Sequence, residues 1–248
     1  MPARVAALWR HPIKSHGRES LDRVAFSEGQ TMPWDRRWAV AHEAARTDGT
    51  SWAPCMNFSR GAKAPGLMAI TARVDELLGT VTLSHPRRGE ITFDPDKQLR
   101  GFLDWVRPLM PADRAQSARI VRVPDRGMTD TDYPSVSILN MASNDALSAA
   151  MQMPLSMDRW RGNILLDGLS PWEEKTWTGK TLRIGAVEFE IREEITRCLA
   201  TTANPETGVR DADTLEALND VFGHQEFGVY GVVTKGGTVK VGDRIEVL

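Results

Sequence analysis

Residues 181–192 read TLRIGAVEFEIR and contain two short runs in which apolar residues alternate with polar or charged ones. Alternation with a period of two is typical of a β-strand that buries one face. Gly185 and Ala186 separate the runs, so the stretch predicts two strands joined by a tight turn. A further hairpin is predicted over 229–248, around a turn at Lys235-Gly236-Gly237.

Short strand candidates continue toward the N-terminus, separated by Gly, Pro and Asp. Helices are expected behind Asp94 and Pro95, over 143–151 with Ser143 as cap, and over 213–222. The pattern predicts a mostly β protein with a few helices, of the α+β class, with a barrel or sandwich architecture. The strand candidates of the first half are 5–9, 37–42, 68–74, 80–84 and 90–93.

Composition excludes several classes of protein. The 248 residues carry 31 Lys and Arg against 33 Asp and Glu, which argues against a strongly basic nucleic-acid binder. Two cysteines are too few for a zinc ribbon or a self-contained iron–sulfur cluster. No apolar run approaches the roughly 20 residues of a membrane span, and no signal-peptide hydrophobic region is present. A cytoplasmic location with reduced thiols is expected.

Cys198 is the candidate reactive residue. It follows Arg197 directly after a predicted strand, and a neighbouring guanidinium favours the thiolate, which attacks electrophiles or ligates soft metals. The alternative is a buried core cysteine. Cys55 has no cationic neighbour in the sequence and is interpreted as structural or incidental.

Anion-binding groups are predicted in three other segments. Arg159 and Arg161 would point the same way in an extended chain and form an anion clamp, followed by the amide of Asn163; a solvated strand edge is the alternative. The loop over 11–17 offers Lys14 and Ser15 to a phosphate, although both residue types are common in loops. Arg36, next to Asp35, adds a cation, with a surface ion pair as its alternative.

Taken in order, these motifs resemble the MOSC family, named for the C-terminal domain of molybdenum cofactor sulfurase, in its two-part form. Within it they are similar to the amidoxime-reducing proteins of mitochondria and bacteria. The resemblance implies an N-terminal β-barrel-like domain over 1–93 and a MOSC β-barrel domain over 94–248. The matching segments are 11–15, 35–38, 161–164, 177–179, 182–185, 197–202, 204–208, 227–230 and 241–243.

The resemblance further implies a molybdenum cofactor, in which molybdopterin and one protein thiolate hold the metal. The thiolate falls on Cys198, which would be both the metal ligand and a catalytic residue. The cofactor contacts would fall on Lys14, Ser15, Arg36, Arg161, Asn163 and Arg197.

The activity implied is the reduction of N-oxygenated small molecules, such as N-hydroxylated amidines. Electrons would come from a separate donor protein, either ferredoxin-like or a b-type cytochrome with its reductase, and no nucleic-acid partner or membrane span is expected. Asp132 is a candidate proton relay, with turn capping as its alternative. Two other functions stay open: a sulfur carrier with a persulfide on Cys198, and a non-catalytic molybdopterin carrier.

Overall fold

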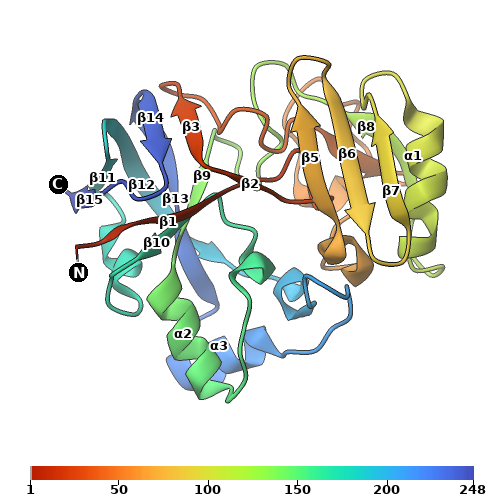
Figure 1. The fold of residues 1–248 in the computed structure, drawn as a ribbon. Coiled ribbons are helices and arrows are strands. Elements are labelled where there is room, and N and C mark those ends of the chain that lie inside the picture. Colours follow the sequence, from red (N-terminus) through yellow and green to blue (C-terminus); the bar gives the residue numbers. More distant parts are fainter. Residues whose placement is uncertain (1) are drawn as a thin grey trace.

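One curled sheet collects strands from both ends of the chain. The computed structural model describes residues 2–248 and arranges them as two lobes side by side (Figure 1). The first lobe contains an eight-stranded sheet with the order β15-β11-β12-β13-β9-β10-β1-β2. Its strands are β1 (Arg4–Arg10), β2 (Glu19–Leu21), β9 (Val136–Asn140), β10 (Ile164–Asp167), β11 (Thr181–Ile184), β12 (Val187–Thr196), β13 (Glu226–Lys235) and β15 (Ile245–Val247).

The strand pair predicted over 181–192 is confirmed. β11 and β12 are antiparallel neighbours that turn at Gly185, whose left-handed φ of 56° suits a residue without a side chain. Leu182, Ile184 and Phe189 face a common apolar core, and none of them is accessible to solvent. The sheet is antiparallel except where β9 runs parallel to β10.

The predicted hairpin over 229–248 is wrong in its pairing. The chain turns after Lys235, but β14 (Gly237–Lys240) pairs with β3 (Arg23–Phe26) and not with β13. β13 instead lies between β12 and β9, while β15 pairs with β11. The Gly-Gly turn fixes where the chain reverses, whereas the partner is a strand that lies more than 200 residues earlier in the sequence.

The second lobe contains two smaller sheets and one helix (Figure 1). β5 (Thr71–Asp75), β6 (Thr80–His85) and β7 (Gly89–Phe93) form an antiparallel meander, and β4 (Ala39–His42) pairs with β8 (Ser117–Val121). α1 (Leu99–Val106) buries Phe102 and Trp105 against them. Residue 93 is the end of the expected N-terminal domain. α1 and β8 follow it in the sequence and pack with β4–β7 of the second lobe. β1–β3 precede it and pair with strands of the first lobe.

Two of the predicted helix starts are wrong, because the predicted caps make other contacts. α1 begins after Gln98, while Asp94 closes the preceding turn by accepting from the Asp96 amide at 2.9 Å. α2 (Met141–Ala150) is capped by Asn140, whose Oδ1 accepts from the Ala142 amide at 3.0 Å. Ser143 is buried inside that helix and donates to Glu174.

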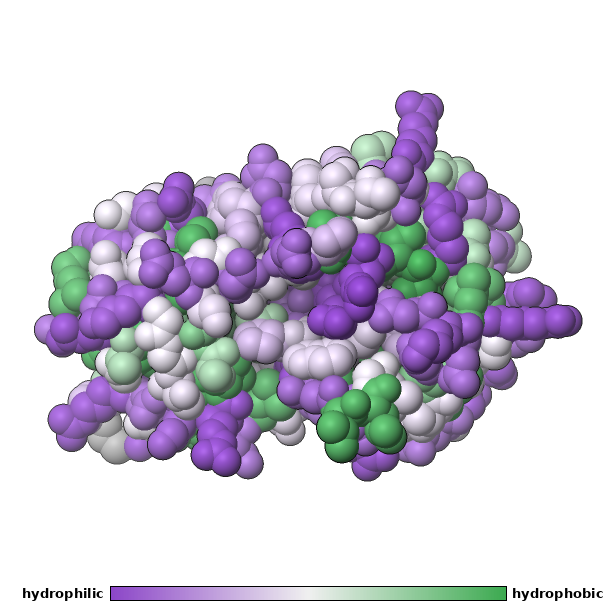
Figure 2. All heavy atoms as spheres, turned by 90° about the horizontal axis from the view of Figure 1, so that it is seen from above, coloured by the Kyte–Doolittle hydropathy of each residue, from purple (hydrophilic) through white to green (hydrophobic). Residues whose placement is uncertain are grey.

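α3 (Thr214–Phe222) begins as predicted, with Asp213 as its cap. No helix within residues 2–248 combines the length and the apolar character needed to cross a bilayer. Figure 2 shows one face of the molecule, on which hydrophilic residues predominate and hydrophobic ones form separate patches. The remaining short elements are the 3-10 helices η1 (Cys55–Asn57), η2 (Pro65–Ala69), η3 (Arg107–Leu109), η4 (Met157–Trp160), η5 (Glu173–Trp177) and η6 (Leu199–Thr202).

Candidate functional site

A cavity of about 230 Å3 is lined by loops from both lobes and by both cysteines. A larger cleft of about 510 Å3 lies nearby around Trp34 and Arg37, but neither cysteine lines it. The smaller cavity is therefore the one that joins a thiol to the cations. Of the predicted site residues, those that line it are Lys14, Ser15, Arg36, Arg159, Arg161, Arg197 and Cys198.

Cys198 lies where the chain leaves β12. It is extended, precedes the first residue of η6, and its carbonyl accepts from the Thr201 amide at 3.1 Å. These contacts fix the backbone on which the thiol is carried. The thiol is exposed, which excludes the alternative of a buried core cysteine.

The Arg197 side chain is held in the cavity wall by backbone carbonyls. It donates to the Phe227 carbonyl at 2.8 Å and 2.5 Å and to the Trp160 carbonyl at 2.7 Å. Burial lowers the pKa of Arg197 to about 10, and none of the ion pairs within residues 2–248 involves this guanidinium. It remains a buried cation without a carboxylate partner.

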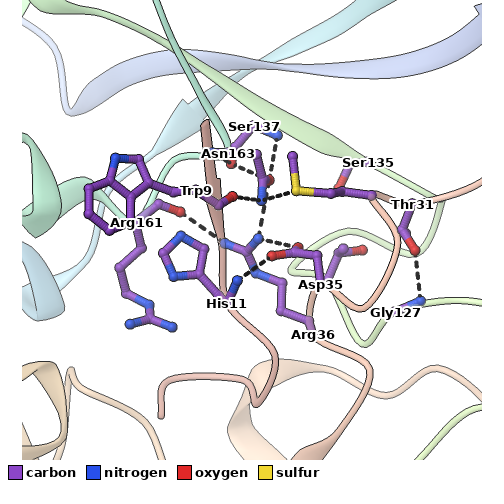
Figure 3. Close-up of polar contacts among 12 residues, drawn as sticks. Trp9, His11, Thr31, Asp35, Arg36, Gly127, Ser135, Ser137, Arg161 and Asn163 are labelled. Carbon is purple, nitrogen blue, oxygen red and sulfur yellow. Dashed lines mark hydrogen bonds and ion pairs between the residues drawn. The ribbon is translucent and has the colours of Figure 1, made fainter. Parts of the chain in front are cut away.

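Arg36 is the centre of the polar network shown in Figure 3. Its Nη1 forms an ion pair with Asp35 and donates to Asn163 Oδ1 at 3.1 Å, while Nη2 donates to the Arg161 carbonyl at 2.9 Å. The Asp35 carboxylate also accepts from the His11 amide at 2.8 Å. Burial opposes the charge on Arg36, but Asp35 and Asp130 together outweigh it and raise the pKa of the guanidinium. The alternative of a surface ion pair is excluded, because Arg36 and Asp35 are both buried.

Asn163 lies behind the cavity wall and not on it. Its Oδ1 accepts from Arg36 and from the amide and hydroxyl of Ser137, and its Nδ2 donates to the Trp9 carbonyl at 3.1 Å. The amide is thus engaged within the protein and positions Arg36.

The predicted clamp of Arg159 and Arg161 is wrong, because the segment is not extended. Arg159 lies inside η4 and pairs with Asp211 at 2.7 Å, whereas Arg161 ends that turn with a left-handed φ of 51°. The Arg161 guanidinium donates to the Gly17 carbonyl at 3.0 Å. Burial, together with Arg36 and another neighbouring arginine, lowers the pKa of Arg161 to about 9.

Lys14 is held by the loop that precedes β9. Its Nζ donates to the carbonyls of Met128 and Thr129 at 2.9 Å and 3.1 Å and pairs with the Asp130 carboxylate at 2.5 Å. Burial would raise the pKa of Asp130, but Lys14 and Arg36 outweigh it and lower that pKa to about 2. Asp130 therefore stays ionised at neutral pH.

Three lining residues adopt a backbone conformation that is costly for a residue with a side chain. Ser15, Arg36 and Arg161 have φ values of 63°, 47° and 51°. Such left-handed residues persist only where their surroundings impose them, and they gather at functional sites. They occur here in three separate loops that meet at one cavity.

The structure does not bring Asp132 into the cavity. Its side chain is exposed, and its carbonyl accepts from Arg126 at 2.6 Å. Asp130, two residues earlier, is the acid that lines the cavity, and sequence reasoning missed it. The pairing with Lys14 joins positions 116 residues apart, so no local signal marks it.

Tyr230 and Arg60 are two further polar lining residues that sequence reasoning missed. Burial raises the pKa of Tyr230, so its hydroxyl stays protonated and can donate a hydrogen bond to a ligand. Arg60 donates to the Cys55 sulfur at 3.0 Å, which places beside Cys55 a cation that its neighbours in sequence do not supply.

Comparison with known proteins agrees with this arrangement. Residues 2–106 match the MOSC N-terminal beta barrel domain, and residues 125–246 match the MOSC domain. The chain belongs to the MOSC family. Cys198, Arg197 and Arg161 lie within the MOSC domain, whereas Lys14, Ser15 and Arg36 come from the N-terminal one.

Curated MOSC relatives match only part of the chain. Mitochondrial amidoxime reducing component 2 of Homo sapiens is 33% identical over 126 residues, which are 46% of this chain and 37% of that protein. Mitochondrial amidoxime-reducing component 1 of Mus musculus is 29% identical, over 56% of this chain and 44% of that protein. Molybdenum cofactor sulfurase 2 of Culex quinquefasciatus is 36% identical, over 35% of this chain and 11% of that protein. This MOSC protein therefore spans less than half the length of these relatives.

Proposed function

We propose that this MOSC protein binds a molybdenum cofactor in the cavity and reduces N-oxygenated small molecules. The observation that carries the proposal is an accessible thiol beside an excess of buried positive charge. Six cations and one carboxylate, Asp130, are among the described residues that line the cavity, and buried charge without a partner is costly in free energy. The cations are Lys14, Arg36, Arg60, Arg159, Arg161 and Arg197, of which Arg36 and Arg159 pair with Asp35 and Asp211 behind the lining.

This charge excess fits the phosphate and pterin of molybdopterin. Arg161 and Arg197 have no carboxylate partner within the described chain, so an anion would stabilise their charged forms. Lys14 and Ser15 belong to a tight turn closed by the His16 amide and the Ile13 carbonyl at 2.9 Å. Such a turn can offer a backbone donor and a hydroxyl to a phosphate, while the Lys14 ammonium, whose three donors are engaged within the protein, contributes charge.

Cys198 fits the metal, because a thiolate is a preferred ligand of soft transition metals. When bound, the cofactor supplies the oxygen-accepting redox centre, and the protein supplies binding and orientation. η6 and the end of β12 fix the Cys198 backbone, while Arg197 holds the adjoining wall. The protonated Tyr230 hydroxyl offers a hydrogen-bond donor in the same cavity.

The substrate class follows the two relatives whose names describe amidoxime reduction. Overall, the N–O bond of the substrate breaks, two electrons and two protons are taken up, and the oxygen leaves as water. The protons come from solvent and the electrons from a separate protein, either ferredoxin-like or a b-type cytochrome with its reductase. The 248 residues hold two cysteines, too few for an iron–sulfur cluster of their own.

Metal and pterin content per chain tests the proposal. The wild type, Cys198→Ala and Cys55→Ala are expressed in a host that makes the cofactor. We expect about one molybdenum and one pterin per chain in the wild type and in Cys55→Ala, with metal lost from Cys198→Ala. Equal metal content in all three would contradict ligation by Cys198. A wild type that holds the cofactor but reduces no N-hydroxylated compound with any donor would indicate a non-catalytic carrier.

The exposed Cys198 thiol also favours a second candidate, a sulfur carrier, since one partial relative is named molybdenum cofactor sulfurase 2. In that case Cys198 carries a persulfide and transfers its outer sulfur. Cyanide-releasable sulfur on the wild type, absent from Cys198→Ala and present in molybdenum-free protein, would replace the first proposal with this one.

A further inference from the structure

Part of the cavity wall is formed by the loop that follows η1, and this loop packs next to Cys198. Arg210 Nη2 donates to the Ala62 carbonyl at 2.8 Å and thereby connects the loop to the segment after η6. Gly61 approaches η6 so closely that a Cβ built on it would lie 3.4 Å from the Ala200 Cβ. Residues 60–62 therefore face the turn that carries Cys198, whereas Lys14, Ser15 and Arg36 belong to other loops.

Arg60 is the charged residue of this loop in the cavity. Its Nη1 donates to Cys55 Sγ at 3.0 Å, which anchors the side chain. None of the ion pairs in the described part of the chain includes Arg60, and its side chain is partly accessible. Its other guanidinium donors are thus available to a ligand.

Arg60 also lines a second cleft, of about 190 Å3, which adjoins the cavity. Apolar side chains in that cleft come from Met56, Phe58 and Met110, and its further cations are Lys63 and Arg114. No Asp or Glu lines it within residues 2–248. The space next to the Cys198 cavity thus combines apolar contacts with positive charge.

We propose that Arg60 selects substrates that bear an anionic group, such as a carboxylate, next to an apolar body. The inference rests on the proposed function and names its substrate class. The N-oxygenated end of the molecule lies toward Cys198, the anionic group pairs with Arg60, and the apolar part contacts Met56 and Phe58. A cationic substrate is disfavoured, because no carboxylate in this cleft offsets Arg60 and Lys63.

The first test compares two compounds that differ in charge: 4-carboxybenzamidoxime and its methyl ester. Cofactor-loaded protein is supplied with a chemically reduced viologen as electron donor. We expect Arg60→Gln to raise KM for the carboxylate about tenfold and to leave KM for the ester within about twofold. Arg60→Lys keeps the charge, so its KM for the carboxylate should lie between those of the wild type and Arg60→Gln. Arg100→Gln, an exposed arginine on α1 outside both cavities, changes neither KM.

The second test needs neither cofactor nor turnover. In Cys198→Ala protein, Cys55 is alkylated with iodoacetate, which is anionic, and with iodoacetamide, which is neutral. Arg60 attracts only the anion, so Arg60→Gln should lower the ratio of the two rates severalfold, whereas Arg100→Gln should not.

The outcomes separate the two proposals. If the wild type reduces both compounds with the same KM and Arg60→Gln leaves KM and the alkylation ratio unchanged, the assignment of Arg60 is overturned. If neither compound is reduced but the alkylation ratio falls in Arg60→Gln, the reductase proposal fails and the anion site at Arg60 stands.

Discussion

Arg36 Nη1 donates to Asn163 Oδ1 at 3.1 Å and so connects the loop before β4 to the loop before β10 (Figure 3). The two residues are 127 positions apart. Asn163 orients the guanidinium, because the same Oδ1 is fixed by the Ser137 amide and hydroxyl. One amide thus sets the position of a cavity cation without lining the cavity.

Removal of that amide should destabilise the protein. In Asn163→Ala, Arg36 and the Ser137 amide lose an acceptor at a site that is 1% exposed. Unsatisfied buried donors cost about 1–3 kcal/mol each, so we expect a loss of about 2–4 kcal/mol in the free energy of unfolding. Urea denaturation measures it. Asn219→Ala removes an exposed hydrogen bond and is the control, with an expected change below about 0.5 kcal/mol. Equal losses of unfolding free energy in Asn163→Ala and Asn219→Ala would contradict the role of Asn163.

Arg161 should limit stability in the absence of cofactor and promote cofactor binding. Burial and Arg36 disfavour its charge, Asp35 and Asp130 offset this only in part, and no carboxylate in the described chain forms an ion pair with it. Asn tolerates the left-handed backbone found at this position. We therefore expect Arg161→Asn to lose most of its bound pterin, measured by fluorescence after oxidation. Its cofactor-free form should unfold at the same temperature as the wild type or higher. A lower unfolding temperature with normal pterin content would show that Arg161 is structural.

Glu174 should make stability depend on pH. Its carboxylate is 0% exposed and accepts from Asn140 and Ser143 at 2.8 Å, and burial raises its pKa above the ordinary value of 4.5. The folded state therefore favours the protonated form. The protonated Glu174 carboxyl contributes fully to stability at a pH below its ordinary pKa. This contribution is lost as pH rises through the raised pKa.

We expect Glu174→Gln to remove this part of the pH dependence. The variant should gain stability relative to the wild type as pH rises above 4.5, as measured by urea denaturation at each pH. Glu216→Gln, on the exposed side of α3, is the matched control. If plots of the free energy of unfolding against pH run parallel for the wild type and Glu174→Gln, Glu174 is not the source of this pH dependence.

Asp132 and Arg126 should differ in their effect on activity. The Asp132 side chain is exposed outside the cavity, so Asp132→Asn should keep turnover within about twofold. Arg126 donates to the carbonyls of Thr131, Asp132 and Tyr133 and holds the loop that carries Asp130. Arg126→Gln should therefore lower cofactor content severalfold. A large loss of turnover in Asp132→Asn with normal cofactor content would restore Asp132 as a proton relay.

Local sequence patterns predict much of the fold but not the long-range pairings. The strand pair over 181–192 and the helix over 213–222 depend on neighbours in sequence, and both are confirmed. The β14 partner depends on a strand from the start of the chain, and Ser143 is drawn from its predicted cap position to a buried carboxylate. No periodicity in sequence encodes these contacts.

The candidate site was likewise predictable only in part. Lys14, Arg36 and Arg161 line one cavity, as residue type and the family resemblance indicate. The clamp geometry fails because Arg161 has a left-handed backbone that a spacing rule cannot foresee. Arg60 follows Cys55 by five residues, and only the loop conformation after η1 brings the two together.

The sheet that joins both ends of the chain also orders the events of folding. β4–β8 are complete once residue 121 has left the ribosome, so that lobe can form early. β1 waits for β10, and β3 waits for β14, more than 200 residues later. Tyr230 and the strand that carries it are synthesised after the other residues that line the cavity. The cavity is thus complete only once Tyr230 has been synthesised, and a ligand that requires all of its walls can bind only after that point.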